Sequence, residues 1–345
     1  MVYFIYLMIS FVLSVFFTLL CIKIARRYNI VDIPNERKIH KEPVPYLGGI
    51  AIFLSFMITF IIGLKTSSLF NLEERIIGVL VAGTLIFLFG LYDDLKGSHP
   101  FFKFFIQIVV ALILVSFGFI IDRVTNPFGG HIMFPGWLSV ILTVFWIIAI
   151  INAVNLLDGL DGLASGVIGI ASFFVFFISL TQYNYIVAFI SIILIGSSFG
   201  FLLFNFPPAK IFMGDAGSMF LGFIFSVLAI LGNRKSAVAL SLLIPIVLLS
   251  IPILDTLLAI IRRANKKKNI FEADKEHIHH RLINLGIPYK KVILLIYVVC
   301  VYLGFISFLS VWLPKEFIFT LMLIVGINIM IGLYVLKLVE DHVKK

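Results

Sequence analysis

Long apolar runs, each followed by a short polar or charged segment, recur along the whole chain. A helix needs about 20 consecutive apolar residues to cross a bilayer. Runs of about that length lie near residues 2–24, 47–64, 75–92, 101–121, 136–152, 163–181, 184–204, 216–232, 237–261, 291–313 and 316–338. The pattern predicts an all-α polytopic integral membrane protein with about eleven transmembrane helices. Because no loop is long enough to fold alone, we expect a single membrane domain over residues 1–345.

The composition agrees with a membrane protein. Of the 345 residues, 61% are hydrophobic and only 13% are charged, about half the charged fraction of an average soluble domain. The first apolar run has no positive segment before it and is long for a signal peptide, so we interpret it as the first span. Cys21 and Cys300 both lie in apolar runs, which favours packing over a disulfide or a metal pair.

The net charge of +9 is divided unevenly between alternate loops. Only six of the 27 Lys and Arg residues fall in one set of loops: Lys65, Arg75, Arg123, Arg234, Lys235 and Lys315. The positive-inside rule therefore places the other, basic set in the cytosol, with the N-terminus outside and the C-terminus cytoplasmic. No basic groove with interleaved aromatic residues is visible, which argues against nucleic acid as a partner.

Acidic residues return to the predicted cytoplasmic side in several separate loops. They stand where apolar runs begin or end: Asp93, Asp94, Asp158, Asp161 and Asp215. A carboxylate at the edge of hydrocarbon is costly, so it usually pairs, binds a cation or takes part in chemistry. The pattern predicts one cation-dependent site that is built from several loops and faces the cytosol.

The tract 152–166 carries Asn155, Asp158 and Asp161, spaced by three residues. A helical turn would place these three side chains on one face, and the three glycines of the tract allow a ligand to approach the backbone closely. The tract lacks the twelve-residue pattern and terminal Glu of a calcium loop. The adjacent Asp93 and Asp94 repel each other unless a cation or proton separates them, which favours Mg²⁺ or phosphoryl transfer over a solvated helix end.

Two glycine-containing segments at predicted helix starts offer backbone N–H groups to an anion. Gly214-Asp215-x-Gly-Ser218 suits a metal-bound pyrophosphate, and Gly48-Gly49 follows a basic, proline-rich loop that suits phosphates. The basic loop also fits a simple positive-inside anchor. Both interpretations of the loop stay open at this point.

Two further features lie late in the chain. Asp255 stands inside the ninth apolar run, where it is either functional or paired with Arg262 or Arg263. The run His277-Ile-His279-His280-Arg281 fits the binding of phosphate oxygens. Zinc is a poorer fit because no Cys is near and the loop offers little ligand geometry.

Taken in order, these motifs resemble those of the polyprenyl-phosphate N-acetylhexosamine-1-phosphate transferases, glycosyltransferase family 4. The resemblance covers nearly the whole chain and all five predicted cytoplasmic loops: Lys41…Gly48-Gly49, Asp93-Asp94, Asn155-x-x-Asp158-Gly-x-Asp161-Gly, Asn205…Gly214-Asp215-x-Gly-Ser218 and His277-x-His279-His280-Arg281. The His loop looks like that of the GlcNAc branch, closest to the bacterial undecaprenyl-phosphate enzymes. The muramoyl-pentapeptide branch has adjacent His residues there and a Thr-Pro-Thr-Met-Gly-Gly type motif, where this chain has Val44-Pro-Tyr-Leu-Gly-Gly49.

The resemblance implies transfer of GlcNAc-1-phosphate from UDP-GlcNAc to undecaprenyl phosphate in the cytoplasmic membrane, with release of UMP. It implies Mg²⁺ as the cofactor, with Mn²⁺ as a substitute, held by Asp215, Asp93 and Asp94. The catalytic residues would be Asp93, Asp94 and His279. The substrate contacts would be Lys41, Lys103, Asn155, Asp158, Asp161, Asn205, Phe212, His277, His280 and Arg281. Whether the protein forms a homodimer stays open.

Other activities would need different residues from those in this chain. The muramoyl-pentapeptide transferase is the alternative within the family. A CDP-alcohol phosphotransferase would need an Arg after Asp-Gly-x-x-Ala, whereas Ala164 comes one position early and no Arg follows. A transporter would favour sites at the membrane midplane and repeated halves. We favour direct attack assisted by Asp93 over a covalent intermediate, because a phosphomonoester, with a second pKa of about 6, is already largely ionised.

Overall fold

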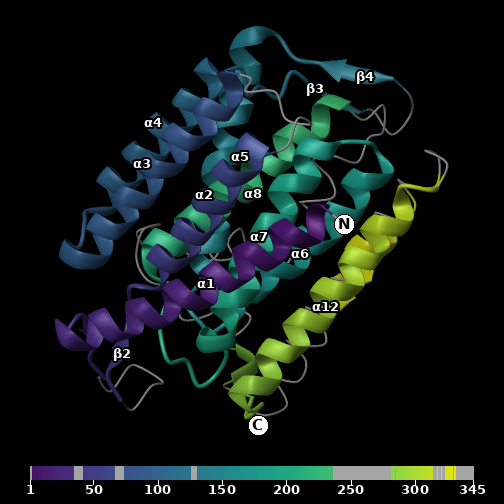
Figure 1. Cartoon of the computed structure of the whole chain (residues 1–345). Helices are drawn as coiled ribbons and strands as arrows, with labels where there is room; N and C mark the ends of the chain where they lie inside the picture. The colour runs from purple at the N-terminus through teal and green to yellow at the C-terminus, as the bar shows by residue number, and fades with distance from the viewer. Residues whose placement is uncertain are drawn as a thin grey trace.

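The computed structural model describes residues 2–34, 42–66, 74–125, 130–235, 281–283 and 285–313, with a few positions between 317 and 331. This part of the chain is mostly helical (Figure 1). Eight of its helices are long and apolar enough to cross a membrane: α1 Val2–Arg27, α2 Gly48–Thr66, α3 Glu74–Lys96, α5 Gly136–Leu157, α6 Leu163–Thr181, α7 Tyr185–Asn205, α8 Gly214–Lys235 and α12 Tyr289–Ser310. The predicted polytopic membrane class is therefore confirmed. The predicted run 237–261 and most of 316–338 lie outside the described residues, so the count of eleven and the orientation of the termini stay predictions.

Helix α4, Pro100–Ser116, is shorter than the predicted run 101–121. It ends because Phe117 caps it and Gly118 adopts a φ of +81°, a conformation that does not continue a right-handed helix. Its 17 residues extend about 26 Å at 1.5 Å per residue. That length is close to the hydrocarbon thickness of about 30 Å, so α4 can carry the chain from one face of the bundle towards the other.

Two short antiparallel hairpins correct the all-α prediction. Strands β1 Val31–Asp32 and β2 Val44–Pro45 pair in the register Val31↔Pro45, between α1 and α2. Strands β3 Arg123–Thr125 and β4 His131–Met133 pair in the register Val124↔Ile132, between α4 and α5. The apolar pattern does not predict them because each strand has only two or three residues. The first hairpin forms part of one wall of a cavity, which Val31, Asp32 and Val44 line.

Small residues allow close packing of the helices. In Figure 1, α1 crosses in front of α7, and the hydroxyls of Ser10 and Ser14 donate to the carbonyls of Ile193 and Ser197 at 2.8 and 2.7 Å. A Cβ at Gly200 would lie 2.7 Å from a carbonyl of α1. Membrane helices have no hydrophobic effect to hold them together, so such close approach and inter-helical hydrogen bonds supply the association.

The loops that carry the acidic residues meet at one face of the bundle. There the α3–α4, α5–α6 and α7–α8 connections lie beside the β1–β2 hairpin and the start of α12. Backbone hydrogen bonds link these separate connections, such as Phe212 N–H to the Pro45 carbonyl at 2.7 Å. The prediction that carboxylates from several loops share one face is confirmed.

Candidate active site

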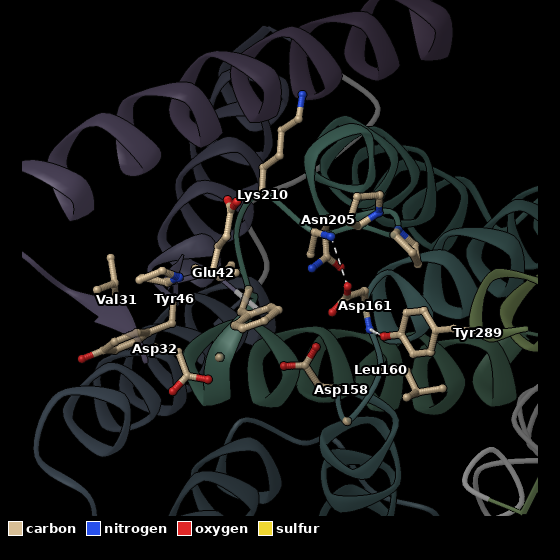
Figure 2. Close-up of a pocket in the computed structure, with 18 of the residues that line it drawn as sticks. Val31, Asp32, Glu42, Tyr46, Asp158, Leu160, Asp161, Asn205, Lys210 and Tyr289 are labelled. Atoms are coloured by element: carbon tan, nitrogen blue, oxygen red, sulfur yellow. Dashed lines mark hydrogen bonds between the residues drawn. The ribbon is translucent and has the colours of Figure 1, made fainter. Parts of the chain in front are cut away.

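A cavity of about 1450 Å³ opens on this face (Figure 2). Asp158, Asp161 and Tyr289 approach it from one side, and Asp32 and Tyr46 of the hairpin region face them from the other. The predicted substrate contacts Asn205 and Phe212 also line it, as do Asp94 and Lys210. The cavity therefore joins residues from five separate connections into one site.

A cluster of polar side chains at the end of α3 brings together residues of four helices. The Lys103 ammonium of α4 lies 3.5 Å from Asp93 Oδ2 and 3.4 Å from Asn155 Oδ1, and it contacts Asp215 Oδ2 directly. The Asn155 amide donates to Asp215 Oδ1 at 2.6 Å and to the Ser218 hydroxyl at 2.9 Å. Three oxygen atoms from α3, α5 and α8 thus converge on one cationic position.

The first turn of α8 is occupied by Asp94. Its carboxylate accepts the Asp215 N–H at 2.7 Å and the Ala216 N–H at 3.0 Å. The expectation that these N–H groups serve a pyrophosphate therefore needs correction, because an internal carboxylate already satisfies them. Gly214 makes this contact possible: its φ is +72°, and a Cβ there would lie 2.5 Å from Asp94 Oδ2.

The start of α2 is also occupied by protein groups. Gly48 N–H donates to the Phe212 carbonyl at 3.0 Å, and Gly49 N–H donates to the Met213 carbonyl at 2.8 Å. A Cβ at Gly49 would collide with the backbone of Gly217. The interpretation of Gly48-Gly49 as a phosphate cradle is therefore corrected: the pair allows α2 to pack against α8 and holds the segment that presents Phe212 to the cavity.

Asn155, Asp158 and Asp161 do not share one helical face, contrary to the expectation from their spacing. Helix α5 ends at Leu157, Asp158 follows as its C-cap, and Gly162 takes a φ of +74° before α6 begins. Asn155 consequently reaches the polar cluster, while Asp158 and Asp161 reach the cavity. The glycines that the sequence shows are what turn the chain here.

The turn at residues 158–162 is fastened by two tyrosines that sequence reasoning missed. Tyr289 accepts the Asp161 N–H at 2.6 Å (Figure 2), and the Tyr297 hydroxyl donates to the Gly162 carbonyl at 2.5 Å. The two stand eight residues apart in α12, slightly more than two turns, so they project from nearly the same face. Two tyrosines at that spacing in an apolar run were the sequence signal that could have indicated this contact.

Asn205 holds the same turn from the other side. Its carbonyl oxygen accepts the Gly162 N–H at 2.9 Å, and its amide donates to the Ile211 carbonyl at 2.9 Å. The residue is only 2% exposed. Asp161 extends this link, because its Oδ2 accepts the Ala209 N–H at 3.1 Å. Asn205 thus ties two walls of the cavity together, in addition to lining it.

The Asp158 carboxyl lies in an environment that disfavours its charge. Burial raises its pKa well above the ordinary range, and the carboxylates of Asp215, Asp94 and Asp161 raise it further. The backbone N–H of Gly214 opposes the shift without cancelling it. Several carboxylates held close together in a cavity are typical of a site that receives a cation or a proton.

One more pair was missed by sequence reasoning. Gln107 and Asn152 exchange hydrogen bonds between α4 and α5, with Asn152 Nδ2 donating to Gln107 Oε1 at 2.6 Å and Gln107 Nε2 donating back at 3.3 Å. A lone Gln inside an apolar run was the signal. Of the other predicted site residues, Lys41, His277, His279 and His280 lie outside the described residues, as does Asp255. Arg281 is half-buried in a helical turn that precedes α12.

Comparison with known proteins decides the family. The model of glycosyl transferase family 4 matches residues 76–233, which contain the whole polar cluster. The chain is 39% identical over 333 residues to the "Probable undecaprenyl-phosphate N-acetylglucosaminyl 1-phosphate transferase" of Bacillus subtilis, covering 93% of this chain and 90% of the relative. The chain belongs to glycosyl transferase family 4.

Other relatives match over most of their length. A decaprenyl-phosphate N-acetylglucosaminephosphotransferase of Mycobacterium leprae is 35% identical, covering 83% of this chain and 77% of the relative. An undecaprenyl-phosphate alpha-N-acetylglucosaminyl 1-phosphate transferase of Haemophilus influenzae is 31% identical, covering 82% and 80%. The predicted family membership is confirmed.

The oxygen donors of this family 4 chain fit a hard divalent cation. Asp93, Asn155 and Asp215 supply carboxylate and amide oxygens around the position of the Lys103 ammonium. Across the part of the chain that the structure describes, no group of three or more His, Cys, Asp or Glu could hold a metal by itself. Mg²⁺ commonly binds through one or two carboxylates, with waters and substrate phosphates completing its shell. The few oxygen donors of this cluster therefore suit Mg²⁺.

Proposed function

We propose that this protein transfers GlcNAc-1-phosphate from UDP-GlcNAc to undecaprenyl phosphate, releasing UMP. The names of the B. subtilis and H. influenzae relatives describe this transferase activity with undecaprenyl phosphate. The observation that carries the proposal is the convergence of Asp93, Lys103, Asn155 and Asp215 beside a cavity of about 1450 Å³. The product would be the first lipid-linked intermediate of a cell-wall or surface polysaccharide.

The proposed reaction is a displacement at the β-phosphorus of UDP-GlcNAc. A phosphate oxygen of the lipid forms the new bond to this phosphorus, the bond to the bridging oxygen breaks, and UMP leaves with the electron pair. Asp93, at the end of α3, would take any proton that the lipid phosphate still carries. The Lys103 ammonium would stabilise charge on the phosphate oxygens.

A bound Mg²⁺ would neutralise negative charge on the pyrophosphate. Asp215 and Asn155 are the residues we assign to hold it, because their oxygen atoms lie together in the cluster, where both contact the Lys103 ammonium. A metal there would take the place of that ammonium on these oxygens, and Lys103 would turn to the phosphate groups. Ser218 supports that geometry through its hydrogen bond to the Asn155 amide. With Asp215 and Asn155 assigned to the metal, Asp93 of α3 would remain available as the base.

The cavity would receive the nucleotide. Phe212 lines it and is an aromatic surface on which a uracil ring can stack, while Asp158 and Asp161 border the same space. The charge distribution, with basic residues concentrated on one set of loops, supports a cytoplasmic position for this face. The substrate contacts that we propose for Lys41, His277, His280 and Arg281, and the catalytic role for His279, would complete the site.

The decisive experiment measures UMP release by the purified protein with undecaprenyl phosphate and, in turn, UDP-GlcNAc, UDP-GalNAc or the UDP-muramoyl-pentapeptide. We expect lipid-dependent release from UDP-GlcNAc. Release from the muramoyl nucleotide alone would support the other branch of the family, and solute translocation without UMP release would support a transporter.

Asp93→Asn and Asp215→Asn should each lower the UMP-release rate by about 100-fold or more, the scale of losing a base or an electrostatic partner. Asp122→Asn is the matched control, because Asp122 is an exposed carboxylate paired with Arg123, away from the cluster. Wild-type rates in either cluster variant would refute the site. Trapping a phospho-enzyme in the absence of lipid would replace direct attack with a covalent, two-step mechanism.

A further inference from the structure

We propose that Asp94 is a positioning residue that fixes the first turn of α8, and that it neither binds the metal nor moves a proton. The inference rests on the proposed function, and it gives the two adjacent carboxylates of α3 different tasks. Asp93 meets the Lys103 ammonium, whereas Asp94 meets the backbone of residues 215 and 216.

The hydrogen bonds of Asp94 show how it is used. Its two oxygens each accept one N–H from consecutive residues, Asp215 at 2.7 Å and Ala216 at 3.0 Å. Those N–H groups belong to the positive end of α8, where a carboxylate is favoured. Consecutive helical residues point about 100° apart, so the Asp93 side chain is directed elsewhere. Both carboxylate oxygens of Asp94 therefore hold the backbone at Asp215, the residue that we assign to the metal.

The surrounding glycines fit this contact. Gly90 stands one turn before Asp94 in α3, and a Cβ there would lie 2.6 Å from Ala216 Cα and 2.7 Å from its backbone nitrogen. A Cβ at Gly214 would lie 2.5 Å from Asp94 Oδ2. Helix α3 thus touches the Asp215–Ala216 peptide with Gly90 and caps it with Asp94. Two neighbouring features of one helix face serve the same backbone segment.

This contact determines where the Asp215 carboxylate points. The backbone of Asp215 is held by Asp94, and its side chain reaches Lys103 and Asn155. If the cap is lost, the first turn of α8 can shift while every oxygen donor of the cluster is still present. Loss of Asp94 should therefore weaken metal binding moderately, whereas loss of a true ligand should remove it.

The test measures Mn²⁺ binding to the purified protein by electron paramagnetic resonance, without substrates. Asp94→Asn retains one acceptor oxygen, so we expect Mn²⁺ affinity to fall by about fivefold, the scale of one lost capping bond. Asp94→Leu retains none and should fall further. Asp215→Asn should abolish measurable binding. At saturating Mn²⁺, Asp94→Asn should keep kcat for UMP release within about tenfold of wild type, while Asp93→Asn loses about 100-fold or more.

A second variant perturbs the contact without changing any carboxylate. Gly90→Ala adds a Cβ against the Ala216 backbone and should weaken Mn²⁺ binding as Asp94→Asn does. Gly83→Ala is the matched control on the same helix, because its Cβ would meet only side chains, the nearest at 3.2 Å. The proposal is overturned if Asp94→Asn abolishes Mn²⁺ binding as Asp215→Asn does, or if Gly90→Ala binds Mn²⁺ like wild type.

The two proposals fail separately. A wild-type protein that binds Mn²⁺ but releases no UMP from UDP-GlcNAc would refute the substrate, and the comparison of Asp94→Asn with Asp215→Asn would still decide the role of Asp94. Conversely, normal UMP release by the wild type with loss of kcat in Asp94→Asn equal to that of Asp93→Asn would keep the function and refute the positioning role.

Discussion

Replacing Gln107 by Leu should destabilise the protein more than its single side chain suggests. Gln107 is fully buried between α4 and α5, where its amide and that of Asn152 exchange hydrogen bonds. Leucine is similar in size but has no polar atoms. The substitution therefore removes both bonds and leaves the Asn152 amide with only the Ile148 carbonyl, at 2.8 Å, among these partners.

The magnitude follows from the unequal cost of breaking one side of a pair in which Gln107 is buried and Asn152 partly buried. A typical hydrogen bond contributes about 1 kcal/mol, but a buried polar group left without its partner costs about 1–3 kcal/mol. Hydrogen bonds between membrane helices average about 0.6 kcal/mol when measured directly. We therefore expect Gln107→Leu to lower the free energy of unfolding by about 1–2 kcal/mol. The double variant Gln107→Leu/Asn152→Leu should recover most of this loss, because no amide then lacks its partner.

The assay is denaturation by SDS of the protein in mixed micelles, followed by helical circular dichroism. Ser116→Ala is the control on the same helix, since Ser116 is exposed and its hydroxyl donates to the local Ile113 carbonyl; it should change stability by less than about 0.5 kcal/mol. A double variant that loses as much as the two single variants together would refute the paired-amide explanation. So would a Gln107→Leu protein as stable as wild type.

Three further predictions concern the site itself. Lys103→Met should lower kcat for UMP release by about 100-fold, with Lys103→Arg retaining more activity than Met because it keeps the charge; equal losses would contradict the role. Burial raises the pKa of Asp158 in the folded protein. The unfolded chain therefore loses this proton first, and the folded state loses stability relative to it as the pH rises above the unfolded pKa of about 4. Asp158→Asn should therefore raise the melting temperature at neutral pH, and the gain should vanish at pH 4; a loss at neutral pH would contradict this. Tyr289→Phe removes the acceptor of the Asp161 N–H and should raise KM for UDP-GlcNAc by about fivefold with little change in kcat, whereas Tyr302→Phe, an exposed tyrosine of the same helix, should change neither.

Much of the site could be predicted from the alternation of apolar runs and charged loops. Because spans alternate in direction, Asp93, Asp158 and Asp215 had to return to one face if the runs were counted correctly. The basic loops predict that this face is cytoplasmic, and that orientation stays a prediction. These inferences need only periodicity and charge, which are properties of the chain that a single sequence displays.

The different tasks of Asp93 and Asp94 could not be predicted in the same way. The two residues are chemically identical and adjacent, so only the crossing of α3 with α8 decides which one meets Lys103 and which one meets a backbone. The glycines were ambiguous for a similar reason. Gly48 and Gly49 indicated close approach by something, and the structure shows that the approaching group is the protein backbone.

The arrangement separates chemistry that all family substrates share from recognition that distinguishes them. Asp93, Lys103, Asn155 and Asp215 stand near helix ends and contact one another. In the proposed reaction they would act on phosphate groups, which every nucleotide-sugar donor and lipid acceptor contains. The sugar differs between donors, so its recognition must lie in other walls of the cavity. The hairpin and the 158–162 turn face each other across that space (Figure 2). Changes in the walls that contact the sugar should alter the ratio of KM values between donors, while changes in the cluster should lower kcat for all of them, because the cluster would contact phosphate groups that all the donors share.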